Sequence, residues 1–310
     1  MDKHKPIVSV CCLVYNHEPY LRECFEGFIM QQTTFPIEIL VHDDASTDHS
    51  ADIICEYTAK YPDLFKPIYQ TENQYSKGVD VFVLNVKRAK GKYIAVCEGD
   101  DYWTDPLKLQ KQVEFLEANK DVGYVFTKHQ ILRLDRDNIY SDCERLANTP
   151  QITDLHYLFK NQILPQTLTI CFKTSLCPMQ FPEGLYSDLA LLVVIAQNCK
   201  IGFINEYSGV YRMGVGICSR LKRINAARKY AKLHKAINKY TGGRYNYKFG
   251  RSARCRILYQ AYRVERKYYP IAYIYYIVWQ ISEKGFNSKN IYTILKNTFR
   301  KFRKIKNLCH

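Results

Sequence analysis

Three apolar runs near the start of the chain each end in a cluster of polar and acidic residues. Ile7 to Val14, Ile37 to Val41 and Tyr93 to Cys97 have the length and composition of buried strands. The stretches 18–32 and 50–61 carry apolar residues at helical spacing. Alternation of buried strands with amphipathic helices predicts an α/β fold, in which a mostly parallel sheet is flanked by helices.

The same patterns predict further elements as far as residue 211, although residues 127–165 show no clear periodicity. Helices are expected at 80–89, from Leu109 to Leu116 and from Asp188 to Asn198. The remaining predicted strands are Ile68–Tyr69, Val122–Phe126, Leu168–Phe172 and a strand at Ile201–Ile204 that returns through Tyr207–Tyr211.

Composition narrows the class of protein. With 310 residues and 47% hydrophobic residues, the chain can bury one large core or two modest ones. The 12 cysteines include no C-x-x-C pair and lie mostly in apolar runs, which favours reduced, buried thiols over a disulfide framework or a zinc site. The segment before Ile7 has no apolar stretch of signal-peptide length, so we expect cytosolic chemistry.

Charge divides the chain into two parts, although the whole carries a formal charge of +15. Residues 220–310 contain 24 Lys and Arg against two acidic residues, whereas residues 1–219 contain 21 against 28. We therefore expect a catalytic domain at 1–218 and a basic, aromatic helical region at 219–310. The excess of positive charge indicates that this second region meets an anionic surface.

Three segments of the basic region have helical patterns. Residues 219–240 place apolar side chains at core spacing before Gly242-Gly243, and residues 270–281 are apolar and aromatic but too short to span a bilayer. Residues 288–308 have the pattern of a helix that lies in the plane of a membrane surface. The alternative is that these segments pack on the catalytic domain and their lysines form a solvated face.

Polar residues at the carboxyl ends of strands build the ligand site in open α/β sheets. The first strand here ends in Tyr15-Asn16-His17-Glu18, the second in 42–48, and the third in Glu98-Gly99-Asp100-Asp101. Carboxylates gathered at one edge repel each other unless a cation is supplied, and Mn²⁺ or Mg²⁺ prefers such oxygen ligands. Asp100 is the first candidate ligand and Asp101 the second. Singly, each cluster also suits a helix cap or a polar turn.

These clusters and the strands before them resemble a known family. The segments Val8–Asn16, Ile39–Asp48 and Gly91–Trp103 are similar to the hallmarks of family 2 inverting glycosyltransferases, which have the GT-A fold. The resemblance covers about residues 6–215. It is strongest to bacterial members that build capsule, lipopolysaccharide or other surface glycans.

The resemblance implies a role for each matching position. The metal-binding D-x-D motif falls on Glu98-Gly99-Asp100, where Glu replaces the first Asp, so Asp100 is the more secure ligand and Glu98 and Gly99 adjoin the donor. Arg212 matches a closing loop that faces the diphosphate, and Gly214 stands where some relatives have a metal-binding His. The other positions expected to bind the donor are Tyr15, Asn16, Glu18, Asp43, Asp44 and Ser46.

On the acceptor side, the resemblance makes Asp188 the candidate catalytic base, although an Asp there also suits a helix N-cap. Tyr102 and Trp103 are a candidate platform for the acceptor sugar, although aromatic residues beside a strand end often belong to the core. In the expected reaction Asp188 accepts the proton of the attacking hydroxyl, and one displacement inverts the anomeric centre.

The expected protein is thus a glycosyltransferase that uses Mn²⁺ or Mg²⁺ and a nucleoside-diphosphate sugar, with a UDP-sugar as the first choice. Its acceptor is expected to be a glycan or lipid-linked, at the cytoplasmic face of the membrane, with no nucleic-acid partner. Two alternatives remain from the sequence: a nucleic-acid-binding protein that uses the basic tail, and an inactive relative that only binds sugar nucleotides. A nucleotidyltransferase is less favoured because the chain has no Gly-rich phosphate loop.

Overall fold

The computed structural model describes residues 5–134, 138–140, 146–215, 222–264, 269–284, 293–294 and 296–297. The chain divides into two compact units. The first unit contains residues 1–181 and 186–219, and the second contains residues 182–185 and 220–310. Each unit is described by itself.

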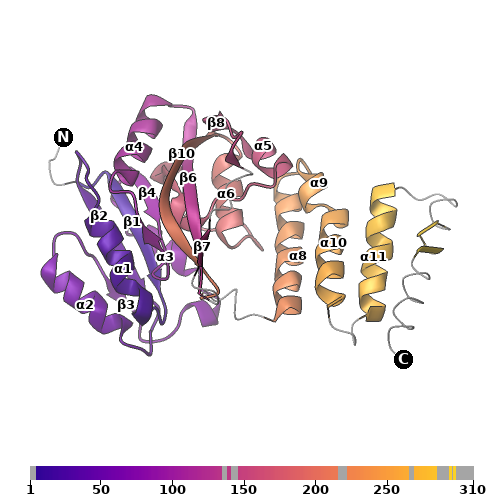
Figure 1. Ribbon diagram of the computed structural model, residues 1–310, viewed down its shortest axis with the longest axis horizontal. Helices are drawn as coiled ribbons and strands as arrows, with labels where there is room; N and C mark the ends of the chain where they lie inside the picture. Colours follow the sequence, from indigo (N-terminus) through magenta and orange to yellow (C-terminus); the bar gives the residue numbers. More distant parts are fainter. Residues whose placement is uncertain are drawn as a thin grey trace. The chain divides into compact units, whose positions relative to one another are not determined.

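One mixed sheet organises the first unit, with its main strands in the order β3-β2-β1-β4-β9-β6-β10-β5. Strands β1, β2, β3 and β4 are parallel, so their carboxyl ends meet at one edge (Figure 1). β9 runs antiparallel between β4 and β6, and β6 pairs in parallel with β10. The strands are β1 Val8–Val14, β2 Ile37–Asp43, β3 Ile68–Tyr69, β4 Tyr93–Val96, β5 Tyr102–Trp103, β6 Val122–Arg133, β7 Asn138–Tyr140, β8 Ile152–Thr153, β9 Cys171–Lys173 and β10 Lys200–Met213.

Helices connect these strands, and aspartate N-caps fix the starts of two of them. Asp80 and Asp154 cap two helices by accepting backbone N–H groups of Val83 and Tyr157. The mostly parallel sheet with flanking helices confirms the fold class predicted from the sequence. The helices of the first unit are α1 Glu18–Ile29, α2 Ser50–Lys60, α3 Val81–Val86, α4 Lys108–Ala118, α5 Leu155–Lys160 and α6 Asp188–Ala196.

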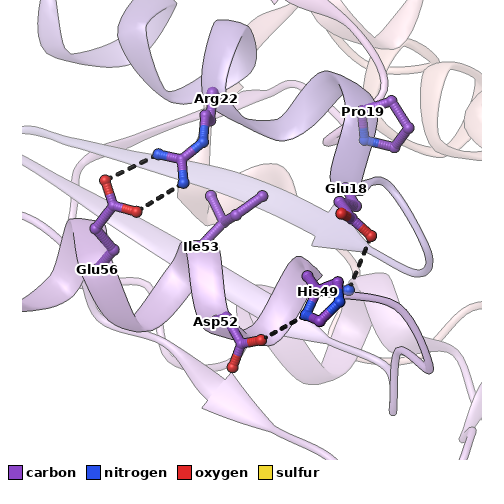
Figure 2. Close-up of a pocket in the computed structure, with 7 residues that line it drawn as sticks. All are labelled: Glu18, Pro19, Arg22, His49, Asp52, Ile53 and Glu56. Atoms are coloured by element: carbon purple, nitrogen blue, oxygen red, sulfur yellow. Dashed lines mark hydrogen bonds and ion pairs between the residues drawn. The ribbon is translucent and has the colours of Figure 1, made fainter.

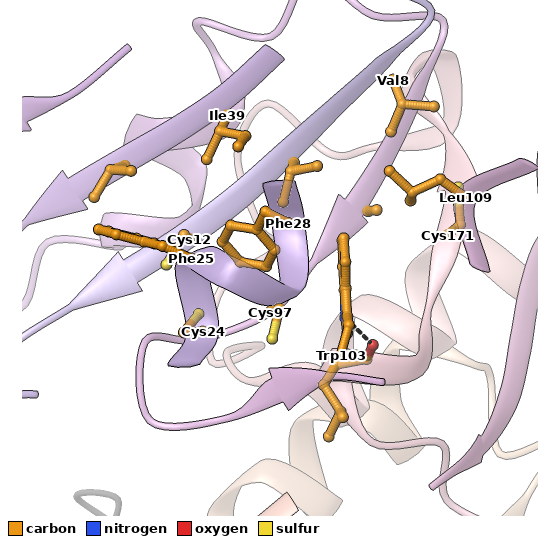
Figure 3. Packing of buried hydrophobic residues seen from close by; sticks show 14 of the residues in the cluster. Val8, Cys12, Cys24, Phe25, Phe28, Ile39, Cys97, Trp103, Leu109 and Cys171 are labelled. Atoms are coloured by element: carbon orange, nitrogen blue, oxygen red, sulfur yellow. Dashed lines mark hydrogen bonds between the residues drawn. The ribbon is translucent and has the colours of Figure 1, made fainter. Parts of the chain in front are cut away.

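The core of the first unit forms where α1 packs on the sheet, as Figure 3 shows. Phe28 meets the Trp103 ring edge-on with centroids 4.8 Å apart, and Phe25 meets the Phe65 ring at 5.0 Å. A Cβ atom at Gly27 would lie 2.9 Å from the backbone N of Trp103, so only glycine permits this approach of α1 to β5. The core therefore lies directly beneath the acidic ends of the strands.

Two predicted strands differ from the structure. Residues 167–169 form a single 3-10 turn, and the strand that follows is limited to β9. The predicted return after Ile204 is instead one long strand, because β10 continues alongside β6 with register shifts near Tyr207. Buried Ser208 is hydrogen-bonded to Thr127 of β6 at 2.5 Å, which joins this part of β10 to the neighbouring strand.

The second unit is helical within its described residues. Its helices are α8 Arg223–Tyr240, α9 Asn246–Phe249, α10 Arg251–Tyr262 and α11 Tyr269–Lys284. Gly242 and Gly243 have φ of 58° and 76° and end α8, as predicted. No helix among the described residues is long and apolar enough to cross a membrane. The predicted helix at 288–308 lies outside the described residues, apart from 293–294 and 296–297.

Candidate functional site

The loop Glu98–Asp101 follows β4 at the carboxyl edge of the sheet. Gly99 joins it to the end of β1, because its N–H donates to the carbonyl O of Leu13 at 3.0 Å. A Cβ atom at position 99 would lie 2.9 Å from Nδ1 of His17. Glycine is therefore required here for close packing, which explains its place between the two acidic residues.

Asp100 is the side chain of this loop with an uncommitted oxygen. It is 4% exposed, and its Oδ1 has no hydrogen-bond partner among the described residues. Its Oδ2 lies 3.9 Å from Nε2 of His17. Asp101 differs, because its Oδ1 accepts the N–H of Arg212 at 2.8 Å. Burial, together with the charge of Asp100, raises the pKa of Asp101 well above its usual range.

Glu98 and Asp188 complete an acidic cluster with Asp100. Burial, followed by the charges of Asp100 and Asp188, raises the pKa of Glu98 to about 8. Burial also raises the pKa of Asp188, whose Oδ1 accepts the N–H of Leu189 at 2.8 Å. Asp188 is the first residue of α6, and Ser187, at φ 86°, occupies the N-cap position. Glu98 and Asp188, 90 positions apart in the sequence, are therefore close enough for their charges to interact.

The two loops that follow β1 and β2 are joined by backbone hydrogen bonds to side chains. Asn16, in the left-handed region at φ 57°, donates its N–H to Oγ of Ser46 and accepts the N–H of Thr47 at its Oδ1. Next along the chain, the N–H of Glu18 donates to Asp48 at 3.1 Å, and Glu18 in turn accepts the N–H of His49. These reciprocal bonds hold the starts of α1 and α2 together.

Asp43 and Asp44 both organise the turn after β2. Asp43 accepts the hydroxyl of Ser46 at 2.5 Å, and burial raises the pKa of Asp43. Asp44 accepts the N–H groups of Gln74 and Tyr75 at 2.8 and 3.1 Å, which fixes the loop after β3 beside the turn. Both carboxylates are buried. Both carboxylates accept hydrogen bonds from nearby backbone N–H groups. Their role in stabilising a polar turn, which the sequence left as an alternative, is therefore confirmed.

Three other predicted residues lie around the acidic loop. Arg212, from β10, is 4% exposed and donates through Nη1 to the carbonyl O of Asp100 at 2.7 Å. Tyr102 is half-buried, with its ring centroid 4.4 Å from Cζ of Arg212. Trp103 is 2% exposed, and its indole N–H donates to the carbonyl O of Leu168. Trp103 is therefore a core residue, which favours the core alternative that the sequence left open over a contact with an acceptor.

Glu18 lines a hollow that shares no residue with the acidic loop. This hollow lies between α1 and α2 and has a volume of about 450 Å³ (Figure 2). Its charged groups are paired with one another: Arg22 makes two bonds to Glu56, and His49 contacts Asp52 at 2.9 Å. None of the lining residues is Glu98, Asp100, Asp101 or Asp188.

The acidic loop fits a divalent cation through one side chain. No group of three or more His, Cys, Asp or Glu residues in the described ranges has the spacing of a metal site. Asp100 nevertheless presents a buried, unbonded carboxylate oxygen, and Mg²⁺ and related ions often take only one or two protein carboxylates. Asp100 is therefore the better ligand of the two predicted, because Asp101 is bonded to Arg212.

Sequence reasoning missed three residues near this loop. His17 lies beside Asp100, while Glu23 and Tyr20 of α1 contact the guanidinium group of Arg212. His17 belongs to the polar motif after β1, so its place in the sequence already indicated that it lies near the site. Glu23 is 55% exposed on an ordinary helix face, and nothing local marks it as a partner of a residue 189 positions away.

Comparison with known sequences links this geometry to transferases. Residues 9–176 match the model of the family described as Glycosyl transferase family 2. An uncharacterized protein of Mycobacterium tuberculosis is 45% identical over 66% of the chain, which aligns with 58% of that protein's own length. WfaP of Escherichia coli is 28% identical over 70% of the chain and 81% of its own length. Its name describes a β-1,3-glucosyltransferase that uses UDP-Glc and GlcNAc-diphosphoundecaprenol.

Solved structures share the fold at low sequence identity. TarS of S. aureus in complex with UDP-GlcNAc matches with a TM-score of 0.60 at 17% identity, over 95% of this chain and 91% of that one. The mannosyltransferase PcManGT of Pyrobaculum calidifontis in complex with GDP-Man and Mn²⁺ matches with a TM-score of 0.57 at 16% identity, over 96% and 81%. The family match spans more than half of the chain and includes the acidic loop. The chain therefore belongs to glycosyl transferase family 2 and has the GT-A fold.

Proposed function

We propose that the protein transfers a sugar from a nucleoside-diphosphate sugar to an acceptor hydroxyl in surface-glycan synthesis, with inversion at the anomeric carbon. The observation that carries the proposal is the buried, unbonded oxygen of Asp100, whose charge, like that of Asp188, acts on the buried carboxyl of Glu98. Such a cluster is unfavourable without a cation. The nucleotide-sugar complexes of the structural neighbours support this choice of donor, with a UDP-sugar as the first choice.

The donor would lie along the carboxyl edge of the sheet. Its nucleoside would rest against the joined loops that contain Tyr15, Asn16 and Ser46, and its diphosphate would reach Asp100. We propose that Asp100 holds Mn²⁺ or Mg²⁺, as the Mn²⁺ complex of PcManGT suggests. When bound, such an ion neutralises negative charge that develops on the departing diphosphate.

Asp188 is the proposed general base. Burial raises its pKa, which makes its carboxylate a better proton acceptor than an exposed one. It would accept the proton of the acceptor hydroxyl while that oxygen attacks the anomeric carbon from the face opposite the diphosphate. The sugar–phosphate bond breaks as the new glycosidic bond forms, and this single displacement inverts the centre.

The composition of the second unit supports a proposal for the acceptor and the cellular place of the reaction. Residues 222–264 contain 13 Lys and Arg and no acidic residue. We propose that this surface attaches the enzyme to the anionic cytoplasmic face of the cell membrane, where the acceptor is a glycan or lipid-linked. The lipid diphosphate in the name of the E. coli relative agrees with a lipid-linked acceptor.

A screen of UDP-, GDP-, CMP- and dTDP-sugars tests the proposal. Thermal unfolding is measured with each compound, with and without Mn²⁺, and a true donor should raise the unfolding temperature beyond the effect of the metal alone. The variant Asp100→Ala should lose this metal-dependent increase, whereas Asp63→Ala, at an exposed position, should keep it.

Two results would reject parts of the proposal. If no sugar nucleotide stabilises the wild-type protein in the presence of metal, the donor assignment is wrong. If a sugar nucleotide binds but neither transfer nor hydrolysis occurs with any of a panel of glycan and lipid-linked acceptors, the inactive sugar-nucleotide-binding alternative is correct.

A further inference from the structure

Arg212 connects several parts of the acidic loop at once. Its backbone N–H donates to Oδ1 of Asp101 at 2.8 Å, and its Nη1 donates to the carbonyl O of Asp100 at 2.7 Å. The next residue, Tyr102 of β5, has its ring centroid 4.4 Å from Cζ. One residue of β10 therefore contacts the last two residues of the acidic loop and the first residue of β5.

The far side of the guanidinium group is fixed by α1. Nη2 forms an ion pair with the carboxylate of Glu23, and the ring of Tyr20 lies 5.1 Å from Cζ. The guanidinium is thus enclosed between two aromatic rings and two acceptors, and Arg212 is only 4% exposed. Its planar group and forked donors suit this arrangement, whereas a lysine supplies only a single point charge.

We infer that Arg212 is a positioning residue that holds the backbone of the acidic loop, and with it the Asp100 carboxylate, in the geometry that receives the metal. This inference rests on the proposed function and replaces the expectation that Arg212 faces the diphosphate. The donors that would bind a phosphate are directed at Asp100 and Glu23 instead. The side chain acts through Asp100 and does not touch the reacting atoms.

The variants Arg212→Lys and Glu23→Gln separate positioning from charge. Arg212→Lys keeps the positive charge but cannot span Asp100 and Glu23, so kcat should fall by about 10²-fold, as expected when catalytic groups move by about 1 Å. The metal concentration for half-maximal activity should rise, while affinity for UDP measured without metal should stay unchanged. Glu23→Gln changes an exposed partner and should shift the metal requirement in the same direction by a smaller factor.

Arg88→Lys is the matched control. Arg88 also donates to backbone carbonyl groups, of Val41 and Lys66, and to Oδ1 of Asn85, and within the described residues it has no hydrogen bond to the acidic loop. Its metal requirement should equal that of the wild type. If Arg212→Lys unfolds, Glu23→Gln decides the question alone.

The outcomes distinguish this inference from the proposed function. Wild-type kcat and metal requirement in Arg212→Lys, or in Glu23→Gln when the first variant does not fold, would overturn the positioning role. Reduced affinity for UDP without metal in Arg212→Lys would show a direct phosphate contact instead. Failure of the wild-type protein to bind any sugar nucleotide with metal would reject the proposed function, and the positioning role that rests on it falls as well.

Discussion

The two units of this protein differ in where they place charged side chains, because the first buries several and the second exposes them. The first buries Asp100 and Asp101 near Glu98, on which the charge of Asp188 also acts, so like charges interact where water is scarce. The second exposes its cations, such as Lys232 and Lys235 of α8, and buries apolar and aromatic side chains. Buried like charges are unfavourable without a counter-ion, whereas exposed cations cost little. The first arrangement supports the proposed metal and donor site, and the second supports the proposed attachment to an anionic surface.

The largest effect should come from the buried acidic cluster. Replacing Asp188 by Asn keeps the shape of the side chain but removes its capacity to accept a proton. We expect turnover to fall by about 10²- to 10⁴-fold while donor binding is spared. Steady-state transfer assays and nucleotide titration measure the two quantities. Full activity of Asp188→Asn would show that the raised pKa of this residue has no catalytic role.

Each unit contains a buried basic side chain, so the two units can also be compared by how stability depends on pH. Lys108 of the first unit is fully buried, with Nζ bonded to Oε1 of Gln112, and burial lowers its pKa to about 8. Between pH 8 and 10.5 the unfolded chain holds this proton while the folded protein has released it, so stability rises with pH by about 3 kcal/mol. Urea unfolding across this range measures the rise. In Lys108→Met it should be smaller by that amount, and an unchanged slope would contradict the assignment.

His234 of the second unit should show its pH dependence on the acid side. Burial, followed by the nearby charges of Lys248 and Arg254, lowers the pKa of His234 to about 4. Its neutral form therefore contributes stability above pH 6.5 that is lost as pH falls toward 4, by about 2–3 kcal/mol. Thermal unfolding followed from pH 7 to 4 should show a shallower decline in His234→Gln. Parallel declines for both proteins would place the acid sensitivity elsewhere.

The smallest effect should come from a single exposed cation. Lys235→Gln should change the free energy of unfolding by less than about 0.5 kcal/mol. Removing one such charge should weaken binding to phosphatidylglycerol vesicles by about 1 kcal/mol, roughly fivefold, at low salt. Sedimentation with vesicles measures this change, and Lys60→Gln, an exposed lysine of α2, is the control. Equal vesicle binding by both variants would reject the surface role of α8.

Much of the fold was predictable because local patterns agreed with it. The strands after Ile7 and Ile37 and the end of α8 at Gly242 follow from apolar runs and turn residues, which act over a few positions. The sequence left open whether Trp103 belongs to the core or contacts an acceptor, because its contacts with Phe28 and Gly27 are set by how α1 crosses β5. The same limit applies to β10, because its continuation past Ile204 depends on pairing with β6, where Ser208 is hydrogen-bonded to Thr127.

The sequence by itself determined the family, the alternation of strands and helices, and the acidic residues at the strand ends. These properties reside in short segments, so they are visible before any packing is known. Only the tertiary structure decided which carboxylate keeps an unbonded oxygen. Oδ1 of Asp101 accepts a hydrogen bond from the N–H of Arg212, whereas Oδ1 of Asp100 has no partner among the described residues. That choice depends on contacts between β10, α1 and the loop after β4, which are distant in sequence and meet only when the sheet forms.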